Sequence, residues 1–251
     1  MMEKTEEFSL EISKGALFWL MQALGKVDVV LPGNPFCSLT PAELNVCLDQ
    51  GRMELIQHGL IRPTASIGVE IDRFIASLVE WLSAPERLVL IQVLRSQAEA
   101  RTAGLYSRAE KSLLLEFVND CYHLLLFQED ESLWTHCRNL FGVPITIEPN
   151  PGPTLRLPEP IPILSLFWRD SQAAHRALQV CGLPPSEISV ALDCLRDWKS
   201  LTQLTFFRAQ KGELRLVGMR FLASNGAHLW STTLGKTGTK EFLFAPVVHW
   251  Q

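Results

Sequence analysis

The chain has 251 residues, of which 47% are hydrophobic and 20% charged, a balance typical of an ordered globular protein and not of a disordered or fibrous one. Its net charge at pH 7 is −4, so the field of the whole molecule repels nucleic-acid phosphates and anionic lipid surfaces. Without a local basic patch, we expect neither nucleic acid nor a membrane as a partner.

The first residues and the cysteines favour a location in the cytoplasm. Glu3, Glu6 and Glu7 make the N-terminus acidic, where a signal peptide needs positive charge, and the apolar stretch 16–24 is too short to cross a membrane. The six cysteines show no C-x-x-C spacing, which favours reduced thiols. We expect a cytoplasmic protein with no inserted segment.

Prolines divide the chain. Seven of the fifteen prolines lie in residues 143–162, and because proline fixes φ and removes an amide donor, this stretch is predicted to be an extended connector. The predicted domains are an N-terminal half of helices followed by strands (1–142), the connector (143–162), and a C-terminal half of two helices followed by an antiparallel meander (163–251).

The first strong helix signal covers residues 41–58. Thr40 is placed as its N-cap, with Glu43 three residues on as the partner in a capping box. Gly59 is expected to take the left-handed conformation that ends the helix. The helix end, RMELIQHGLIRP, also resembles a DNA-recognition element, but residues 41–73 hold three arginines against five acidic residues. A winged-helix-like DNA-binding regulator is therefore kept as an alternative only.

A second helix is predicted over residues 69–81, followed by a strand over residues 88–94. The strand is continuously apolar apart from one glutamine, as expected of a strand covered on both faces. We therefore expect it to lie in the centre of a sheet.

Motifs that carry catalysis are missing. The sequence contains no G-x-S-x-G, H-E-x-x-H or G-x-G-x-x-G. We predict that the protein is not an enzyme, with an enzyme whose site is assembled from distant residues as an alternative.

One group of residues has metal-ligand chemistry. Cys121 and His123 would share a strand face, and His136 with Cys137 would follow on a helix, a set that fits tetrahedral zinc. Adjacent residues such as His136 and Cys137 point in different directions, however. We predict no metal and no other cofactor, and leave zinc at these four residues as the version to test.

After the connector, helices are predicted over residues 171–180 and 187–198. Asp170 and Ser186 are the expected N-caps, and Gly182 is expected to end the first of these helices.

Strands are predicted over residues 203–208, 213–222, 228–233 and 241–245. A change in the apolar phase predicts a β-bulge near Gly218, and Asn225-Gly226 predicts a type I′ turn. Because the connections between these strands are too short for a crossover helix, we predict an antiparallel sheet and an α+β fold.

The two halves show the same order of elements. Residues 78–83 (LVEWLS) and 195–200 (LRDWKS) share the pattern Leu, any, acid, Trp, any, Ser at an offset of 117. This pattern predicts two quasi-repeated halves, each with helices followed by strands.

Several of these stretches resemble the EspG-type chaperones of type VII secretion. They are the helix with Phe18-Trp19-Leu20-Met21 leading to Val30-Leu31-Pro32, the helix end at 54–61, the helix-to-strand step at 78–86, and the hairpin at Asn225-Gly226. The resemblance implies a soluble, non-catalytic carrier that binds a helical-hairpin protein client.

Such a carrier needs an exposed apolar surface. The residues Met219, Phe221, Trp230 and Phe242 are our candidates, because they are large apolar side chains on the predicted C-terminal meander. The alternative is that these side chains belong to the core.

Overall fold

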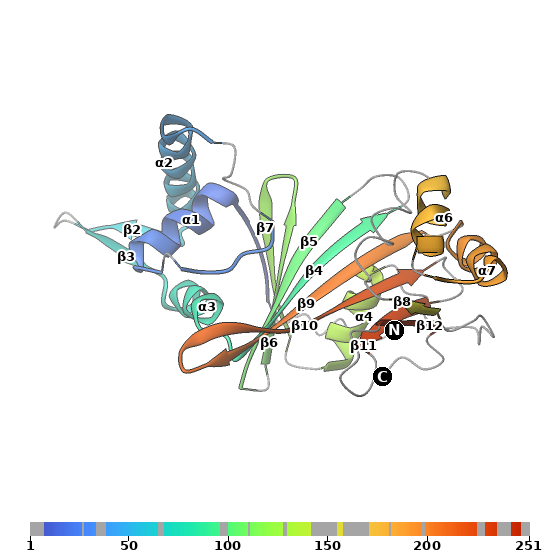
Figure 1. Ribbon diagram of the computed structural model, residues 1–251. Helices are drawn as coiled ribbons and strands as arrows, with labels where there is room; N and C mark the ends of the chain where they lie inside the picture. Colours follow the sequence, from blue (N-terminus) through green and yellow to red (C-terminus); the bar gives the residue numbers. More distant parts are fainter. Residues whose placement is uncertain are drawn as a thin grey trace, which may run out of the picture. The chain divides into compact units, whose positions relative to one another are not determined.

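The computed structural model describes most of the chain. The described residues are 8–26, 28–33, 39–64, 68–95, 100–109, 111–127, 130–141, 155–157, 171–180, 182–196, 199–224, 229–234 and 242–246. They form helices and a large antiparallel sheet (Figure 1), which confirms the predicted α+β class.

The helices are α1 (Lys14–Ala23), α2 (Pro41–Gln57), α3 (Arg73–Ser83), α4 (Asp130–Phe141), α6 (Ser171–Val180) and α7 (Pro185–Arg196). The strands are β1 (Phe8–Ser13), β2 (Ile61–Pro63), β3 (Val69–Ile71), β4 (Arg87–Arg95), β5 (Ala100–Arg108), β6 (Lys111–Val118), β7 (Cys121–Phe127), β8 (Leu155–Leu157), β9 (Ser200–Gln210), β10 (Glu213–Ser224), β11 (Leu229–Leu234) and β12 (Phe242–Pro246). Among the described residues, no helix is both long and apolar enough to cross a membrane.

The strand order of the main sheet is β1-β7-β6-β5-β4-β9-β10-β11-β12-β8, and β2 pairs with β3 in a small second sheet. The central position predicted for residues 88–94 is confirmed, since β4 lies between β5 and β9. Its Leu88 and Ile91 side chains are fully buried. The four strands predicted after the connector are also present, as β9 to β12.

The chain forms two compact units, each built from segments that are distant in sequence. The first consists of Met1–Ile91, Arg101–Leu133 and Thr205–Gly218, and the second consists of Gln92–Ala100, Trp134–Leu204 and Met219–Gln251. The predicted boundaries at 1–142, 143–162 and 163–251 stay a prediction, because the connector lies outside the described residues except for β8.

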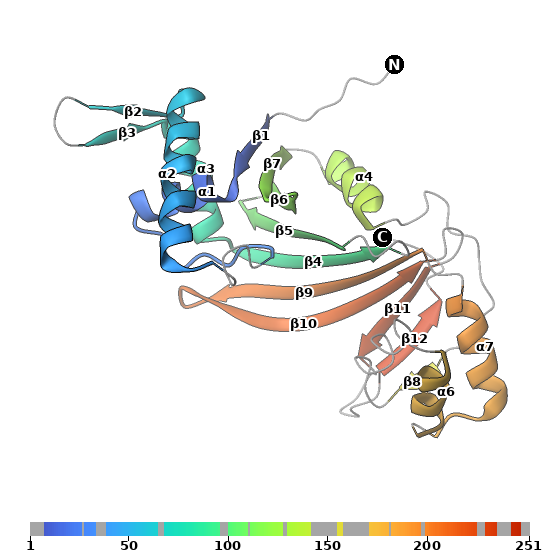
Figure 2. The same cartoon turned by 90° about the horizontal axis from the view of Figure 1, so that it is seen from above.

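In the first unit, α1, α2 and α3 lie together, with the β2–β3 hairpin beside α2 (Figure 2). Helix α2 begins as predicted. The Thr40 hydroxyl accepts the Glu43 amide at 3.3 Å, and the Glu43 carboxylate accepts the Thr40 amide at 2.7 Å. The Thr40 amide, and next the Thr40 hydroxyl, donate to this carboxylate and hold the pKa of Glu43 below its ordinary value. The capping box is therefore present.

The end of α2 also matches its prediction. Gly59 has φ +70°, and the amides of Gly59 and Leu60 donate to the carbonyls of Ile56 and Leu55. This double bond pattern is the Schellman motif, which satisfies carbonyls that the helix leaves unpaired. The stretch that resembles a recognition element therefore has a complete capping explanation.

The helix predicted over residues 69–81 was placed too early. Val69–Ile71 forms β3, antiparallel to β2, and the helix begins at Arg73. Asp72 is the N-cap, and its carboxylate accepts the amides of Phe74 and Ile75 at 2.9 and 3.1 Å. An N-cap aspartate accepts the free amides of the first helical turn, so it stands directly before the helix. The residues that precede Asp72, Val69–Ile71, are therefore not part of α3.

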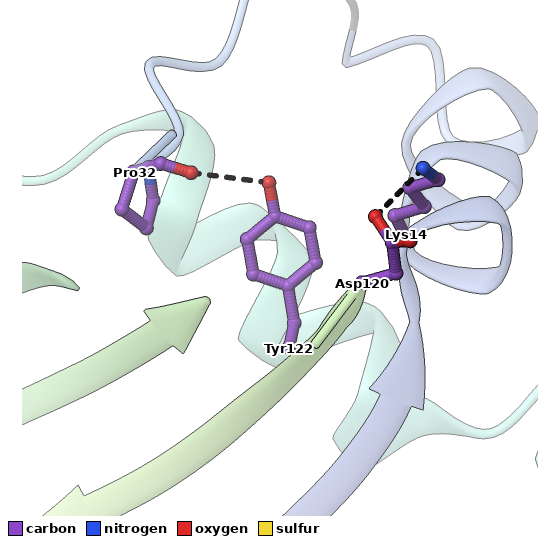
Figure 3. A network of polar contacts seen from close by, with 4 residues as sticks. All are labelled: Lys14, Pro32, Asp120 and Tyr122. Carbon is purple, nitrogen blue, oxygen red and sulfur yellow. Dashed lines mark hydrogen bonds and ion pairs between the residues drawn. The ribbon is translucent and has the colours of Figure 1, made fainter. Parts of the chain in front are cut away.

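Two buried tyrosines fix the segment 28–33 to the sheet of the first unit. Tyr106 donates its hydroxyl hydrogen to the Val30 carbonyl, and Tyr122 donates to the Pro32 carbonyl at 3.2 Å (Figure 3). Burial raises the pKa of both phenols. We call residues 28–33 the strap, since its carbonyls satisfy hydroxyls that would otherwise be buried without a partner.

An ion pair closes the β1–β7 corner nearby. The Lys14 ammonium lies 2.8 Å from the Asp120 carboxylate, at the start of α1 and in the β6–β7 turn (Figure 3). The Lys14 amide donates to the Asp120 carbonyl at the same place. Asn119 and Asp120 both have positive φ, at 50° and 65°, as a two-residue hairpin turn requires.

In the second unit, α6 ends as predicted, with Gly182 at φ +81°. The prediction of Ser186 as N-cap was wrong, since α7 begins at Pro185, two residues before the predicted first residue Glu187. The fixed φ of proline suits the first turn of a helix. Asp170 and the turn at Asn225-Gly226 lie outside the described residues. The bulge near Gly218 stays a prediction.

Candidate protein-binding surface

In the first unit, large apolar side chains are most exposed at two places. On α2, Val46 and Met53 are 56% and 55% exposed, and on β10, Leu216 and Val217 are 59% and 63% exposed. Single exposed apolar residues are ordinary, whereas neighbouring ones are typical of a binding surface. The β10 pair is adjacent in sequence, so both faces of the strand are exposed at this point.

These two residues belong to the β9–β10 hairpin, drawn as two long neighbouring strands in Figure 2. Lys211 and Gly212 connect the strands, with φ angles of 54° and 83° that match a type I′ turn. A two-residue turn pairs Gln210 with Glu213. The same register places Arg208 opposite Arg215 and Phe207 opposite Leu216.

The two faces of the hairpin differ in chemistry. Phe207 and Leu214 pack against the hydrophobic core of the first unit, which covers their face in part. The other face carries Arg208, Arg215 and Val217, of which all three are exposed. Side chains alternate between the faces of a strand, so the register alone produces this division.

The exposed part of the hairpin is basic in an acidic chain. Residues 205–218 hold three basic residues and one acidic residue, a net charge of +2, whereas the whole chain carries −4. The single acidic residue, Glu213, lies 3.8 Å from the Arg215 guanidinium, at a site where both side chains are well exposed. Water screens such a pair, so it neutralises Arg215 weakly. We use the name hairpin surface for Arg208, Arg215 and Val217 on one face of the hairpin, Leu216 on the opposite face, and Lys211 in the turn.

Strand β10 also has an open edge. Its pairing with β11 covers Leu222–Ser224, and among the described residues no strand pairs with Glu213–Gly218 on the side away from β9. On the far side of β9, the Ala209 amide donates to the Glu86 carbonyl at 2.9 Å. The Ala209 amide therefore points away from β10. This is the expected alternation if the backbone groups of Arg208 and Gln210 bond to β10.

Comparison with known proteins adds to this geometry. No protein-family model matches the sequence, and no curated protein matches it either. Among solved structures, the model matches the type VII secretion system chaperone EspG5 of Mycobacterium tuberculosis, solved in complex with the PE25-PPE41 dimer. The TM-score is 0.63, and the match covers 96% of this chain and 91% of EspG5.

The two chains share one fold. Their sequences are only 10% identical, so the likeness to EspG5 concerns the fold alone. The side chains that could bind a partner must be argued from this chain's own residues.

The four residues predicted to contact a partner are placed differently from one another. Met219 is exposed on β10, next to the hairpin surface, while Phe221 and Trp230 are buried at 7% and 3% exposure. Phe242 lies on β12, and its side chain is outside the described residues. The core alternative accounts for Phe221 and Trp230, and partner contact by these four residues stays a prediction. Sequence reasoning did not select Leu216 and Val217.

The candidate zinc ligands lie on two elements, with Cys121 and His123 on β7 and His136 and Cys137 on α4. Within the described part of the chain, no three cysteine, histidine or acidic side chains gather as a metal site. His123 Nδ1 instead lies 3.7 Å from a Glu11 carboxylate oxygen.

The surroundings of the Cys121 thiol raise its pKa. Partial burial raises its pKa, and the carboxylates of Glu11, Glu54 and Asp120 raise it further. A raised pKa keeps the thiol protonated at neutral pH, and the thiolate is the form that binds metal or reacts.

The alternative of DNA recognition rests on the end of α2. Arg52 and Arg62 are exposed there, and the β2–β3 hairpin follows the helix as a wing would. Nearby carboxylates oppose this role, however. Glu54 accepts the Ser13 amide at 2.9 Å, and Asp49 and Glu70 are exposed on the same elements.

Proposed function

We propose that this protein is a non-catalytic carrier that binds a protein client, as EspG5 binds the PE25-PPE41 dimer. The observation that supports the proposal most is the fold likeness to EspG5, which extends over 96% of the chain. A fold alone does not specify function. The proposal therefore also rests on the hairpin surface, which no covering element occupies among the described residues.

The hairpin surface offers both parts of a protein-binding patch. Leu216 and Val217 supply apolar area, and complete burial of such a side chain contributes about 1.5–3 kcal/mol. Arg208, Lys211 and Arg215 supply a charged rim that attracts an acidic client and aligns it. The client that fits is therefore an acidic protein with an exposed apolar segment.

The test is capture of the client from the native cell with matched variants. The tagged full chain is compared with Leu216→Asp/Val217→Asp and with the control Val46→Asp/Met53→Asp. Both variants place two aspartates at apolar sites that are exposed to a similar degree. Captured proteins are identified by mass spectrometry, and each is then purified and tested for co-elution with the chain.

We expect a specific protein to co-elute with the unchanged chain and with the α2 variant, and to be lost with the hairpin variant. If the α2 variant alone loses the client, the binding surface lies on α2. If no protein co-elutes with the unchanged chain at micromolar concentration, the carrier proposal is wrong.

A further inference from the structure

Among the described residues, Glu213–Gly218 of β10 has no strand partner on the side away from β9, beside the apolar part of the hairpin surface. Each edge residue carries an amide donor and a carbonyl acceptor that another strand can bond. Proteins protect edge strands from pairing with proline, a bulge, a short strand or charged side chains. Residues 213–218 contain no proline and continue to Ser224, and their charged side chains are Glu213 and Arg215. This edge is therefore suited to receive a strand.

The register identifies which backbone groups are available. Because the Lys211-Gly212 turn pairs Gln210 with Glu213, the amides of Glu213, Arg215 and Val217 point toward β9. The amides of Leu214, Leu216 and Gly218 point outward. At the other end of β10, the Ser224 carbonyl accepts the Lys199 amide at 2.6 Å, so this alternation does not continue unchanged along the whole strand.

The charges indicate the chemistry of the incoming strand. Arg208 and Arg215 face each other across the hairpin, and like charges directly opposite destabilise a strand pair. Glu213 forms an ion pair with Arg215 at 3.8 Å, and both side chains are well exposed. A carboxylate on an added strand would lie beside Arg215 on the same face and relieve the repulsion.

We propose that the client is bound in part as an added β-strand along Glu213–Gly218 of β10, and that this client segment presents carboxylates beside Arg215 and apolar residues beside Val217. The inference deepens the proposed carrier function and rests on it. The backbone of Leu214, Leu216 and Gly218 supplies the hydrogen bonds. The side chains of Arg208, Arg215 and Val217 select the acidic, apolar face of the segment.

Hydrogen exchange gives the most direct test. The probe is a fluorescein-labelled peptide, Thr-Val-Thr-Val-Thr-Glu-Thr-Glu-Thr, and the control peptide carries lysine in place of glutamate. NMR of the full chain should show exchange at the outward amides of Leu216 and Gly218 slowed at least about tenfold by the probe, because strand addition pairs them. The inward amide of Val217 should change little.

Variants separate the backbone contribution from the side chain. Leu216→Pro removes an outward amide and the side chain but leaves the β9 hydrogen bonds, as proline on a strand edge does. Leu216→Ala shortens the side chain and keeps the amide. We expect Leu216→Pro to weaken probe binding at least about tenfold, and Leu216→Ala to weaken it less than about threefold.

Several results would overturn the inference. The two Leu216 variants could lose probe binding to the same extent, or the lysine peptide could bind as tightly as the glutamate peptide. The amide exchange of Leu216 and Gly218 could stay unchanged, or single-stranded DNA could bind more tightly than the acidic peptide. Circular dichroism of Leu216→Pro verifies that it folds, and the exchange experiment uses the unchanged chain. If Leu216→Pro still co-elutes with the captured client, strand addition is wrong while the carrier function stands.

Discussion

Helices α1 and α2 cross at a point where each has a glycine, and this contact gives the sharpest stability prediction. A Cβ built on Gly51 would lie 2.2 Å from the Ala16 backbone nitrogen, and one built on Gly15 would lie 2.1 Å from the Cys47 carbonyl oxygen. These are backbone atoms on both sides, so no side-chain rotation can relieve the overlap. Gly51→Ala must therefore move the helices apart.

The sign of the effect is set by two opposing terms. Alanine favours a helix interior by about 1 kcal/mol over glycine, which would stabilise α2. Overpacking costs about 1–3 kcal/mol, and an overlap with rigid backbone belongs at the upper end. We therefore expect Gly51→Ala to lower the free energy of unfolding by about 2 kcal/mol.

Urea unfolding measures this change. Circular dichroism reports the helices, and tryptophan fluorescence reports tertiary structure as a sum over the seven tryptophans, of which Trp19 lies on α1. Gln50→Ala is the control on the same helix, since Gln50 is exposed and its replacement should change stability by less than about 0.5 kcal/mol. A Gly51→Ala variant that is more stable than the unchanged chain would refute the close crossing.

Three further predictions concern titration and capping. Thr40→Ala should lower stability by about 1 kcal/mol in urea unfolding. The same change should return the lowered pKa of Glu43 toward its ordinary value in an NMR titration. Since a lowered carboxyl pKa stabilises above the unfolded value of 4.5 and ceases to do so as pH falls through the folded value, the two proteins should converge in acid. Tyr106 and Tyr122 have raised pKa values, so an absorbance titration should show no tyrosinate near pH 10 until the chain unfolds in alkali, and Tyr122→Phe should cost about 1 kcal/mol. Alkylation of Cys121 by iodoacetamide at pH 8 should be slower in the folded than in the unfolded chain, because its pKa is raised.

Helix boundaries could be predicted from the sequence where the residues at the helix ends have specific capping roles. Thr40 with Glu43 and Gly59 located both ends of α2, because capping depends on neighbours three or four residues apart. The helix that begins at Arg73 was misplaced for the opposite reason. The strand Val69–Ile71 is too short to show a period of its own, so its residues were read as helix although Asp72 gave the true start.

The candidate surface was less predictable than the fold. An apolar residue on a strand shows that one face is covered, but not which one, so Met219 and Phe221 looked alike in sequence although only Met219 is exposed. Leu216 and Val217 did carry a signal. Consecutive apolar residues on a half-covered strand place one of them in solvent, and a basic hairpin in an acidic chain marks the same position.

The open edge of β10 stands out when the two halves of the sheet are compared. In each half a first strand pairs with the last of a four-strand meander, β1 with β7 and β8 with β12. The predicted duplication would produce this order, but the comparison of edges does not depend on it.

The second strand of the first meander, β5, is paired with β6 along Thr102–Arg108. The corresponding strand β10 is paired with β11 only along Leu222–Ser224 in the described part of the chain. Equal topology with unequal pairing among the described residues means that the connectivity alone does not set how much of this edge is paired. Its exposed apolar side chains would promote aggregation without a partner, since an uncovered apolar edge can pair with other chains. A surface that the fold does not need and that is unfavourable in isolation is the surface where a client is expected to bind.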